Sequence, residues 1–129
     1  MAPEPGKGRI LIVDDNVDSA DSMALLMAMY GYEVRTAYDS ASAIREARSF
    51  VPHVALLDLS KPEPDGIALA RQFQEMSETQ KTVLIAFSGY GQPDDLKRTR
   101  QAGFVHHLVK PTDPEVLHKI IKSMRLDER

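Results

Sequence analysis

The sequence has no cysteine among its 129 residues, which excludes a disulfide framework, a thiolate zinc site and a cysteine nucleophile. Basic residues are not in excess either, because the formal net charge is −3, so we expect no nucleic acid to be bound by this chain alone. No apolar run approaches the roughly 20 residues that span a bilayer. The first eight residues lack the apolar region of a signal peptide. These absences predict a cytoplasmic protein that does not enter a membrane.

The composition that remains suits one ordinary folded domain. Hydrophobic residues make up 43% of the chain, enough for a buried core that needs no disulfide or structural metal. The first residues, rich in proline and glycine, predict a flexible N-terminal segment over 1–8. We expect a single domain over 9–126.

Short apolar runs alternate with longer helical patterns along the chain. Strands are predicted at 10–13, 33–37, 54–57, 82–87 and 105–109. Helices are predicted at 17–30, 40–50, 65–77, 93–102 and 113–124, on apolar spacing and on capping residues, proline or glycine near their ends. Strict alternation predicts an α/β fold, a doubly wound five-stranded parallel sheet with helices on both faces. The common strand order for such a sheet is 2-1-3-4-5.

Polar residues stand just past the C-terminal ends of the predicted strands. Asp14 and Asp15 follow the first strand, Asp58 the third, Ser88 the fourth and Lys110 the fifth. In a parallel sheet these ends line one edge, with a crevice where the strand order reverses, between strands 1 and 3. Clustered carboxylates repel unless a cation joins them. An all-oxygen set favours a hard ion such as Mg²⁺, and a lysine opposite it would neutralise a phosphoryl group.

Four motifs give the chain a family resemblance. They are ILIVDD at 10–15, LDLSKPEPDG at 57–66, SGYG at 88–91 and LVKP at 108–111. In this order and spacing the chain resembles the response-regulator receiver family of two-component signalling, from residue 9 to about residue 124. Each motif alone is weak evidence, whereas the four together are specific.

The resemblance implies a phosphoryl-accepting site with a magnesium ion. Asp58 resembles the phosphoacceptor, which attacks phosphorus in line to form an acyl phosphate. Asp15 and Asp58 would bind Mg²⁺ directly, Asp14 would help, often through a water, and the backbone carbonyl of Ser60 would supply a further ligand. Lys110 would pair first with the Asp58 carboxylate and then with the phosphoryl oxygens.

The resemblance also implies a switch. Ser88 would move to hydrogen-bond the phosphoryl group, Gly89 would keep the pocket accessible, and Pro111 resembles the family's cis-proline, which would direct Lys110 inward. His107 stands where the family usually has an aromatic switch residue. The surface that responds would be formed by the fourth helix, fifth strand and fifth helix.

The implied partners are a histidine kinase or a histidine phosphotransfer protein, and a downstream protein. The chain would be a phosphoacceptor that assists its own phosphorylation and dephosphorylation, not an enzyme acting on other substrates. The segments 88–92 and 102–111 resemble receivers of hybrid kinases. The tail after Met124 is too short to fold as an output domain, which leaves a stand-alone regulator or a piece of a longer kinase.

Other interpretations stay open at this stage. Taken singly, three residues could cap the following helix, namely Asp14, Asp15 and Asn16. Asp58, Asp65 and Ser88 could be turn residues, and Lys110 could be solvated. A Mg²⁺-dependent phosphohydrolase of the haloacid-dehalogenase type would need a second aspartate two residues after its nucleophile, where this chain has a serine. A degenerate receiver that only binds a partner would typically have lost an acid or the lysine.

Overall fold

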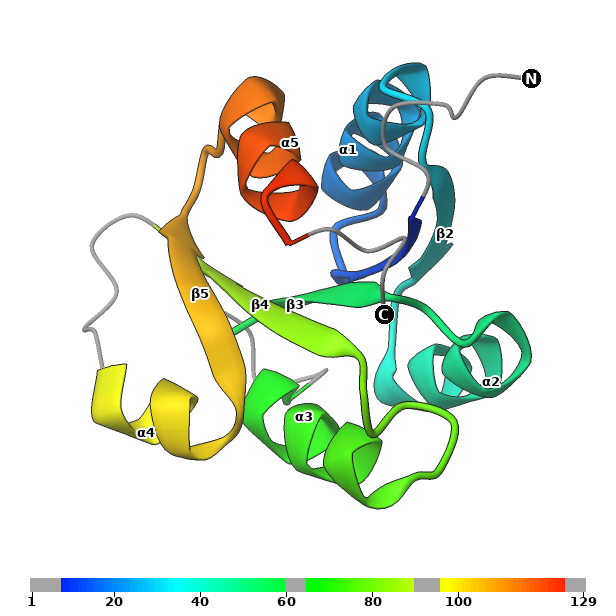
Figure 1. The fold of residues 1–129 in the computed structure, drawn as a ribbon, viewed down its shortest axis with the longest axis vertical. Coiled ribbons are helices and arrows are strands. Elements are labelled where there is room, and N and C mark those ends of the chain that lie inside the picture. Colours follow the sequence, from blue (N-terminus) through cyan, green and yellow to red (C-terminus); the bar gives the residue numbers. More distant parts are fainter. Residues whose placement is uncertain (1–7, 60–64, 90–95, 125–129) are drawn as a thin grey trace.

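The computed structural model describes residues 8–59, 65–89 and 96–124, and its elements are a parallel sheet between two layers of helices (Figure 1). Strands and helices alternate throughout, as β1 (Arg9–Val13), α1 (Val17–Met29), β2 (Glu33–Ala37), α2 (Ser40–Phe50), β3 (Val54–Asp58), α3 (Gly66–Glu75), β4 (Val83–Ser88), α4 (Leu96–Gln101), β5 (Phe104–Val109) and α5 (Pro114–Lys122). The strand order is β2-β1-β3-β4-β5 with all neighbours parallel. The predicted fold class and strand order are confirmed.

The central strands are buried because helices cover both of their faces. Every residue of β3 and β4 is buried, as are four of the five in β1. This agrees with the uninterrupted apolar runs of these strands. In a sheet with one face in water, apolar and polar residues would alternate along each strand. The edge strand β2 alternates between exposed and partly buried residues until Ala37.

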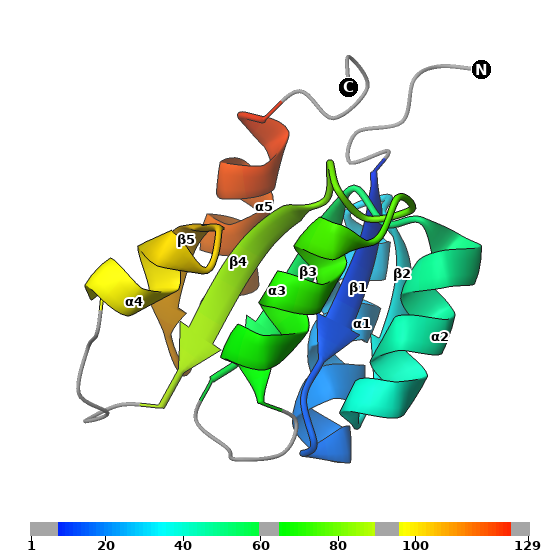
Figure 2. The same cartoon turned by 90° about the horizontal axis from the view of Figure 1, so that it is seen from below.

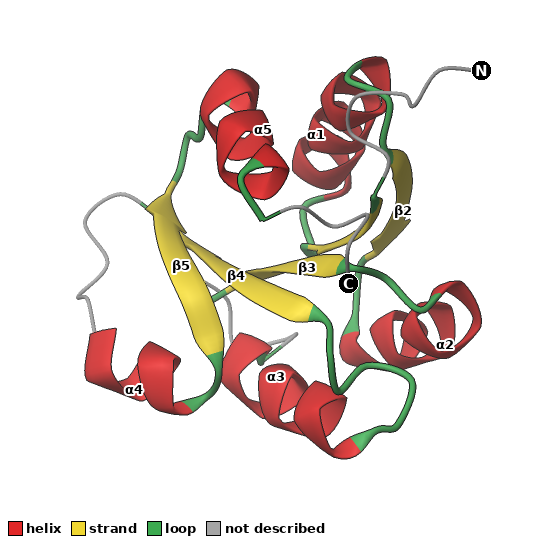
Figure 3. Ribbon diagram, viewed as in Figure 1, coloured by secondary structure: helices red, strands yellow, loops and turns green. Residues whose placement is uncertain are grey.

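Two separate apolar cores hold the helices against the sheet. Figure 3 shows the helices in red on either side of the yellow strands. In the ribbon view α1 and α5 lie on one face, and α2, α3 and α4 lie on the other (Figure 1). The core under α1 and α5 includes Met27, Leu117 and Ile121. The core under α2, α3 and α4 includes Phe73, which is fully buried. Each such side chain stabilises the fold by about 1.5–3 kcal/mol relative to an exposed one.

Short polar side chains begin four of the helices. Asn16 caps α1, Asp39 caps α2, Asp65 caps α3 and Asp113 caps α5, each by accepting a hydrogen bond from a backbone N–H of the first turn. These bonds satisfy donors that the helix itself cannot. Asp65 is therefore a helix cap, whose side chain accepts from the N–H groups of Ile67 and Ala68.

At most of their ends, the observed helices and strands differ from the predicted ranges by one or two residues. The predicted helix 65–77 is observed as Gly66–Glu75, and the last helix as Pro114–Lys122. The predicted start of the fourth helix at residue 93 lies outside the described residues, as does the N-terminal segment up to residue 7. Helix ends fray and their last bonds are weak, so a sequence pattern locates them poorly.

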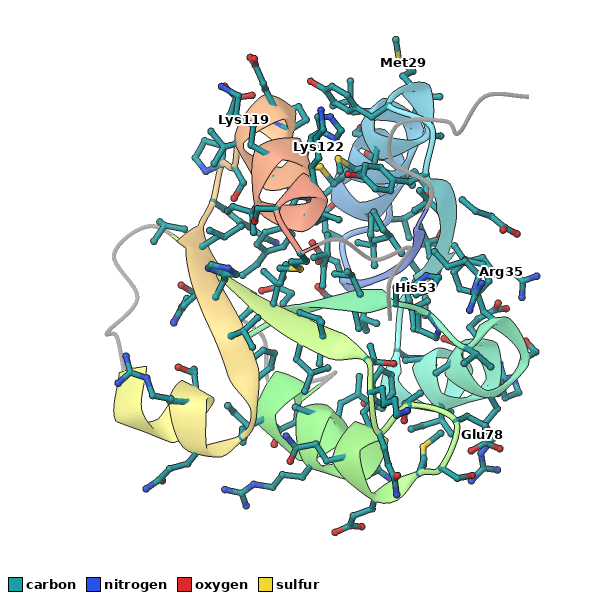
Figure 4. All side chains as sticks on the ribbon, viewed as in Figure 1. Met29, Arg35, His53, Glu78, Lys119 and Lys122 are labelled. Atoms are coloured by element: carbon teal, nitrogen blue, oxygen red, sulfur yellow. The ribbon has the colours of Figure 1, made fainter. Side chains whose placement is uncertain are left out.

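The outer surface carries ordinary polar contacts together with some exposed apolar side chains. On β2, Arg35 lies against α2, where it pairs with Glu46 at 3.2 Å and covers the ring of Phe50 (Figure 4). Met29, at the end of α1, projects outward and is 75% exposed (Figure 4). Within the described ranges, none of the helices combines the length and apolar character that crossing a bilayer requires.

Candidate functional site

Strand register brings two buried carboxylates side by side. In the β1–β3 pair, Val13 is the partner of Leu57, so the next position on each chain carries Asp14 and Asp58. Asp14 lies directly after β1 and is still bonded to β2, because its N–H donates to the carbonyl of Ala37 at 3.1 Å. Asp14 is only 3% exposed and Asp58 only 1%. The C-terminal strand ends meet along one edge of the sheet (Figure 2), which is where the sequence predicted the site.

Asp14 has two hydrogen-bonding roles. Its Oδ1 accepts from the backbone N–H of Asn16 at 3.0 Å, which orders the turn before α1. Its Oδ2 accepts from the Lys110 ammonium at 2.8 Å. The residue that caps α1 is Asn16, whereas Asp14 orders the turn before the helix and binds Lys110.

Lys110 reaches across the sheet edge from the end of β5. Its backbone N–H donates to the carbonyl of Ser88 at 2.8 Å, and its peptide bond to Pro111 is cis. The Lys110 Nζ lies 2.8 Å from an oxygen of Asp14 and 2.8 Å from an oxygen of Asp58. Burial alone would lower the pKa of this lysine, but hydrogen bonds and charge from both carboxylates outweigh it, so the pKa is raised above its ordinary value. The ammonium is therefore the charged partner of both acids at neutral pH, and the solvated-loop interpretation of this residue is wrong.

A third carboxylate completes an oxygen-rich cluster that suits a divalent metal. One oxygen each from Asp14, Asp15 and Asp58 all lie within 4.8 Å of one another, and Asp15 is exposed while the other two are buried. Opposite ligands of an octahedral Mg²⁺ are about 4.2 Å apart, twice the Mg–O distance of about 2.1 Å. Among the residues that the structure describes, these three carboxylates and the Lys110 ammonium sum to a local charge of −2, which one divalent cation balances. The all-oxygen donor set therefore suits a hard divalent cation such as Mg²⁺.

Ser88 and His107 meet on neighbouring strands beside this cluster. Ser88, the last residue of β4, is 5% exposed. Its Oγ lies 2.8 Å from Nε2 of His107 on β5. Ser88 is the register partner of Val109, and side chains repeat on the same face every two residues, so His107 shares its face. Gly89 follows directly and is partly exposed.

A cavity of about 450 Å³ opens next to the carboxylates. It lies between α1 and the start of α5, and Asp14 and Lys110 border it. The rest of its lining is mainly apolar and includes Met23, Leu26 and Phe87. The cavity thus brings a mainly apolar surface up to the acids and the lysine.

Most of the predicted site residues converge at this edge. Those that the structure brings together are Asp14, Asp15, Asp58 and Lys110, with Ser88, Gly89, His107 and Pro111 beside them. Ser60 lies outside the described residues. The contact between Lys110 and Asp14 was not predicted. One sequence pattern could have revealed it: both acids directly follow a four-residue apolar run, so strands aligned by these runs place the acids as neighbours.

Comparison with known proteins gives the same result. The model of the response regulator receiver domain matches residues 10–122. PilH of Pseudomonas aeruginosa is 29% identical over 116 residues, which cover 90% of this chain and 96% of PilH. The transcriptional regulatory protein PrrA of Mycobacterium tuberculosis is 32% identical over 103 residues, which cover 80% of this chain and 43% of PrrA. The sensor kinase/phosphatase CqsS of Vibrio cholerae is 30% identical over 110 residues, or 84% of this chain and 16% of CqsS.

Solved structures agree in fold. A CheY-like receiver domain protein of Methanospirillum hungatei superposes with a TM-score of 0.82 at 28% identity, covering 95% of this chain and 96% of that one. The chemotaxis response regulator CheY4 of Vibrio cholerae superposes with a TM-score of 0.80 at 25% identity, covering 91% and 98%. With this sheet, this sheet-edge cluster and a family match over most of its length, the chain belongs to the response regulator receiver domain family.

Proposed function

We propose that this domain, which we take to span residues 9–126, accepts a phosphoryl group on Asp58 in a two-component system or phosphorelay. The observation that supports this best is the Lys110 ammonium, 2.8 Å from each of two buried carboxylates, with Asp15 close enough to share a metal. A buried acid held next to both a cation and a candidate metal cluster is suited to nucleophilic attack on an anionic phosphorus centre.

The reacting groups in the transfer step are the Asp58 carboxylate and a phosphorylated histidine. A carboxylate oxygen of Asp58 forms an O–P bond while the P–N bond to the imidazole breaks, and the electron pair leaves with that nitrogen, which takes up a proton. The Lys110 ammonium, bonded to Asp58 beforehand, then lies beside the new phosphoryl oxygens and neutralises part of their charge.

Asp15 and Asp58 would hold Mg²⁺ directly, Asp14 would help, often through a water, and the Ser60 carbonyl would supply a further ligand. When bound, the ion supplies Lewis-acid stabilisation of the charge on the transferred group. The exposed position of Asp15 and the buried positions of its two partners leave one side of the cluster open to solvent, where the phosphodonor would approach.

Phosphorylation would then alter the surface of α4, β5 and α5. The new group adds about −1.5 to −2 charges and three strong acceptors. Ser88 and Lys110 would turn toward it, and both are linked to β5, through His107 and through the chain itself. The change in these contacts would shift β5 and its flanking helices between two arrangements. His107 would take part in this switch in the place of an aromatic residue.

The partners follow from the chemistry of the site. The phosphodonor would be a histidine kinase or a histidine phosphotransfer protein, and a downstream protein would read the switched surface. The relatives include a sensor kinase/phosphatase and a transcriptional regulatory protein, so domains similar to this one occur in both kinds of signalling protein. The hybrid-kinase subgroup and the cytoplasmic location stay predictions.

Acetyl phosphate with Mg²⁺, followed by intact-protein mass spectrometry, tests the proposal. We expect the mass of one phosphoryl group to be gained, to be lost in base, and to be absent in Asp58→Asn. Asp113→Asn is the matched control, because this acid caps α5 and is exposed, and it should gain the group normally. Continuous phosphate release at enzyme-like rates would instead favour a phosphohydrolase. Absence of both modification and Mg²⁺ affinity would favour a domain that only binds partners.

A further inference from the structure

The imidazole of His107 makes one hydrogen bond and leaves its other nitrogen buried. Nε2 lies 2.8 Å from the Ser88 hydroxyl oxygen. Nδ1 is buried and has no hydrogen-bond partner within the described part of the chain. This unequal environment of the two ring nitrogens determines which of them carries the proton.

A neutral imidazole has one N–H donor and one bare acceptor nitrogen. If Nδ1 carried the hydrogen, a buried N–H would remain unpaired, which is among the rarest and costliest defects in protein interiors. A bare lone pair at the same place is tolerated better. The hydrogen therefore belongs on Nε2, from where the ring donates to Ser88 Oγ.

The direction of this bond decides what the hydroxyl of Ser88 can do next. A serine hydroxyl has one hydrogen to donate and two lone pairs that accept. If His107 accepted the bond, Ser88 would spend its only hydrogen on the ring. Because His107 donates, Ser88 accepts with one lone pair and keeps its hydrogen for another acceptor.

We propose that His107 is a positioning residue: its Nε2–H donates to Ser88 Oγ and so directs the Ser88 hydroxyl hydrogen to an oxygen of the phosphoryl group on Asp58. This inference rests on the proposed function. It assigns to the histidine a task that phenylalanine cannot perform, since a phenyl ring has no donor. It also makes the link between β4 and β5 a directed hydrogen bond in addition to a packing contact.

The tautomer can be measured without any phosphorylation. Nitrogen-15 NMR of the His107 ring in the unmodified protein, recorded at alkaline pH, distinguishes the ring nitrogen that carries the hydrogen from the bare one. We expect a protonated Nε2 and a bare Nδ1, with the His107 signals assigned by their loss in His107→Phe. A proton on Nδ1 would overturn the inference by itself.

The positioning role is tested by the affinity for trifluoroberyllate, a mimic of the phosphoryl group, in the presence of Mg²⁺. Ser88→Ala removes a hydrogen bond to a charged group and should weaken binding about tenfold or more. His107→Phe should weaken it about threefold or more, whereas His107→Gln, whose Nε2 amide can donate from a similar place, should stay within about twofold. In the Ser88→Ala background, His107→Phe should have no further effect.

Two results would refute the positioning role. One is wild-type affinity in His107→Phe, and the other is a loss in His107→Gln as large as in His107→Phe. Thermal unfolding of each variant verifies that the fold is retained. If the unmutated protein neither binds trifluoroberyllate nor gains a phosphoryl group, the proposed function fails, and the ring spectrum still decides whether His107 donates to Ser88.

Discussion

Lys110→Met is expected to destabilise the metal-free protein by about 3 kcal/mol. Methionine keeps the unbranched shape of the lysine stem and removes the ammonium. Asp14 and Asp58, which both bind that ammonium at 2.8 Å, would then be buried carboxylates with Asp15 close by and without the cation that they share. Without the Lys110 ammonium, the electrostatic repulsion between the three acids is therefore no longer offset.

The magnitude follows from opposing terms. At an effective dielectric constant of about 20, charges 2.8 Å apart attract by about 6 kcal/mol for each of the two pairs. Desolvation of the three groups offsets most of this attraction, and breaking a buried pair typically costs about 3–5 kcal/mol. The Lys110 side chain is 27% exposed, so water screens the pairs in part, and we place the cost near the lower end of that range.

Urea unfolding in the presence of a chelator measures this cost. With a slope of about 2 kcal/mol per molar urea, a loss of about 3 kcal/mol lowers the midpoint by about 1.5 M. Mg²⁺ should stabilise the Lys110→Met variant more than the unmutated protein, because the ion meets no competing ammonium. Adding Asp58→Asn to Lys110→Met should reduce the cost of losing the lysine by about 1 kcal/mol or more, since one buried charge is gone. A midpoint within about 0.3 M of the unmutated protein would refute this account of the cluster.

Three further predictions test other parts of the molecule. Asp15→Asn should remove most of the Mg²⁺ affinity measured by titration calorimetry, yet change metal-free stability by less than about 0.5 kcal/mol because this acid is exposed; unchanged affinity would contradict the metal assignment. Burial, followed by the charge of Lys122, lowers the pKa of His118 in the folded protein. As the pH falls, His118 therefore gains its proton at a higher pH in the unfolded chain than in the folded one. The stability contributed by the neutral ring is present above about pH 6.5 and is lost as the pH falls through the lower folded pKa. Urea unfolding between about pH 8 and pH 5 should therefore show a smaller acid loss in His118→Gln; equal pH profiles would count against this reasoning. Gly103→Ala should cost about 1–2 kcal/mol in urea unfolding, because φ is +101° there and a Cβ would collide with the Gln74 side chain; a neutral result would mean that the turn rearranges.

Strand and helix identities were predictable because local patterns carry them. The apolar runs of β1, β3 and β4 need no knowledge of their neighbours, since strands covered on both faces must be apolar throughout. Helix starts were marked by residues such as Asp39 and Asp113, whose side chains bond backbone groups two or three positions away. Exact helix ends were predicted less well, because fraying and tertiary contacts decide them.

The residues that gather at the candidate site were predictable for a similar reason. A parallel sheet places the C-terminal ends of all its strands along one edge, so residues that follow those strands gather there whatever the loops do. Asp58, Asp15 and Lys110 could therefore be named from the sequence alone, together with the all-oxygen chemistry that favours Mg²⁺.

The sequence alone thus determined the type of sheet, the edge at which chemistry occurs and the residue types available there. Only the tertiary structure decided which of these residues are partners: that Lys110 binds Asp14 as well as Asp58, and that His107 turns one ring nitrogen to Ser88 and buries the other. These contacts join positions 19 to 96 residues apart. Their geometry depends on strand register and on the packing of side chains between layers, and local sequence patterns do not encode distances of that kind.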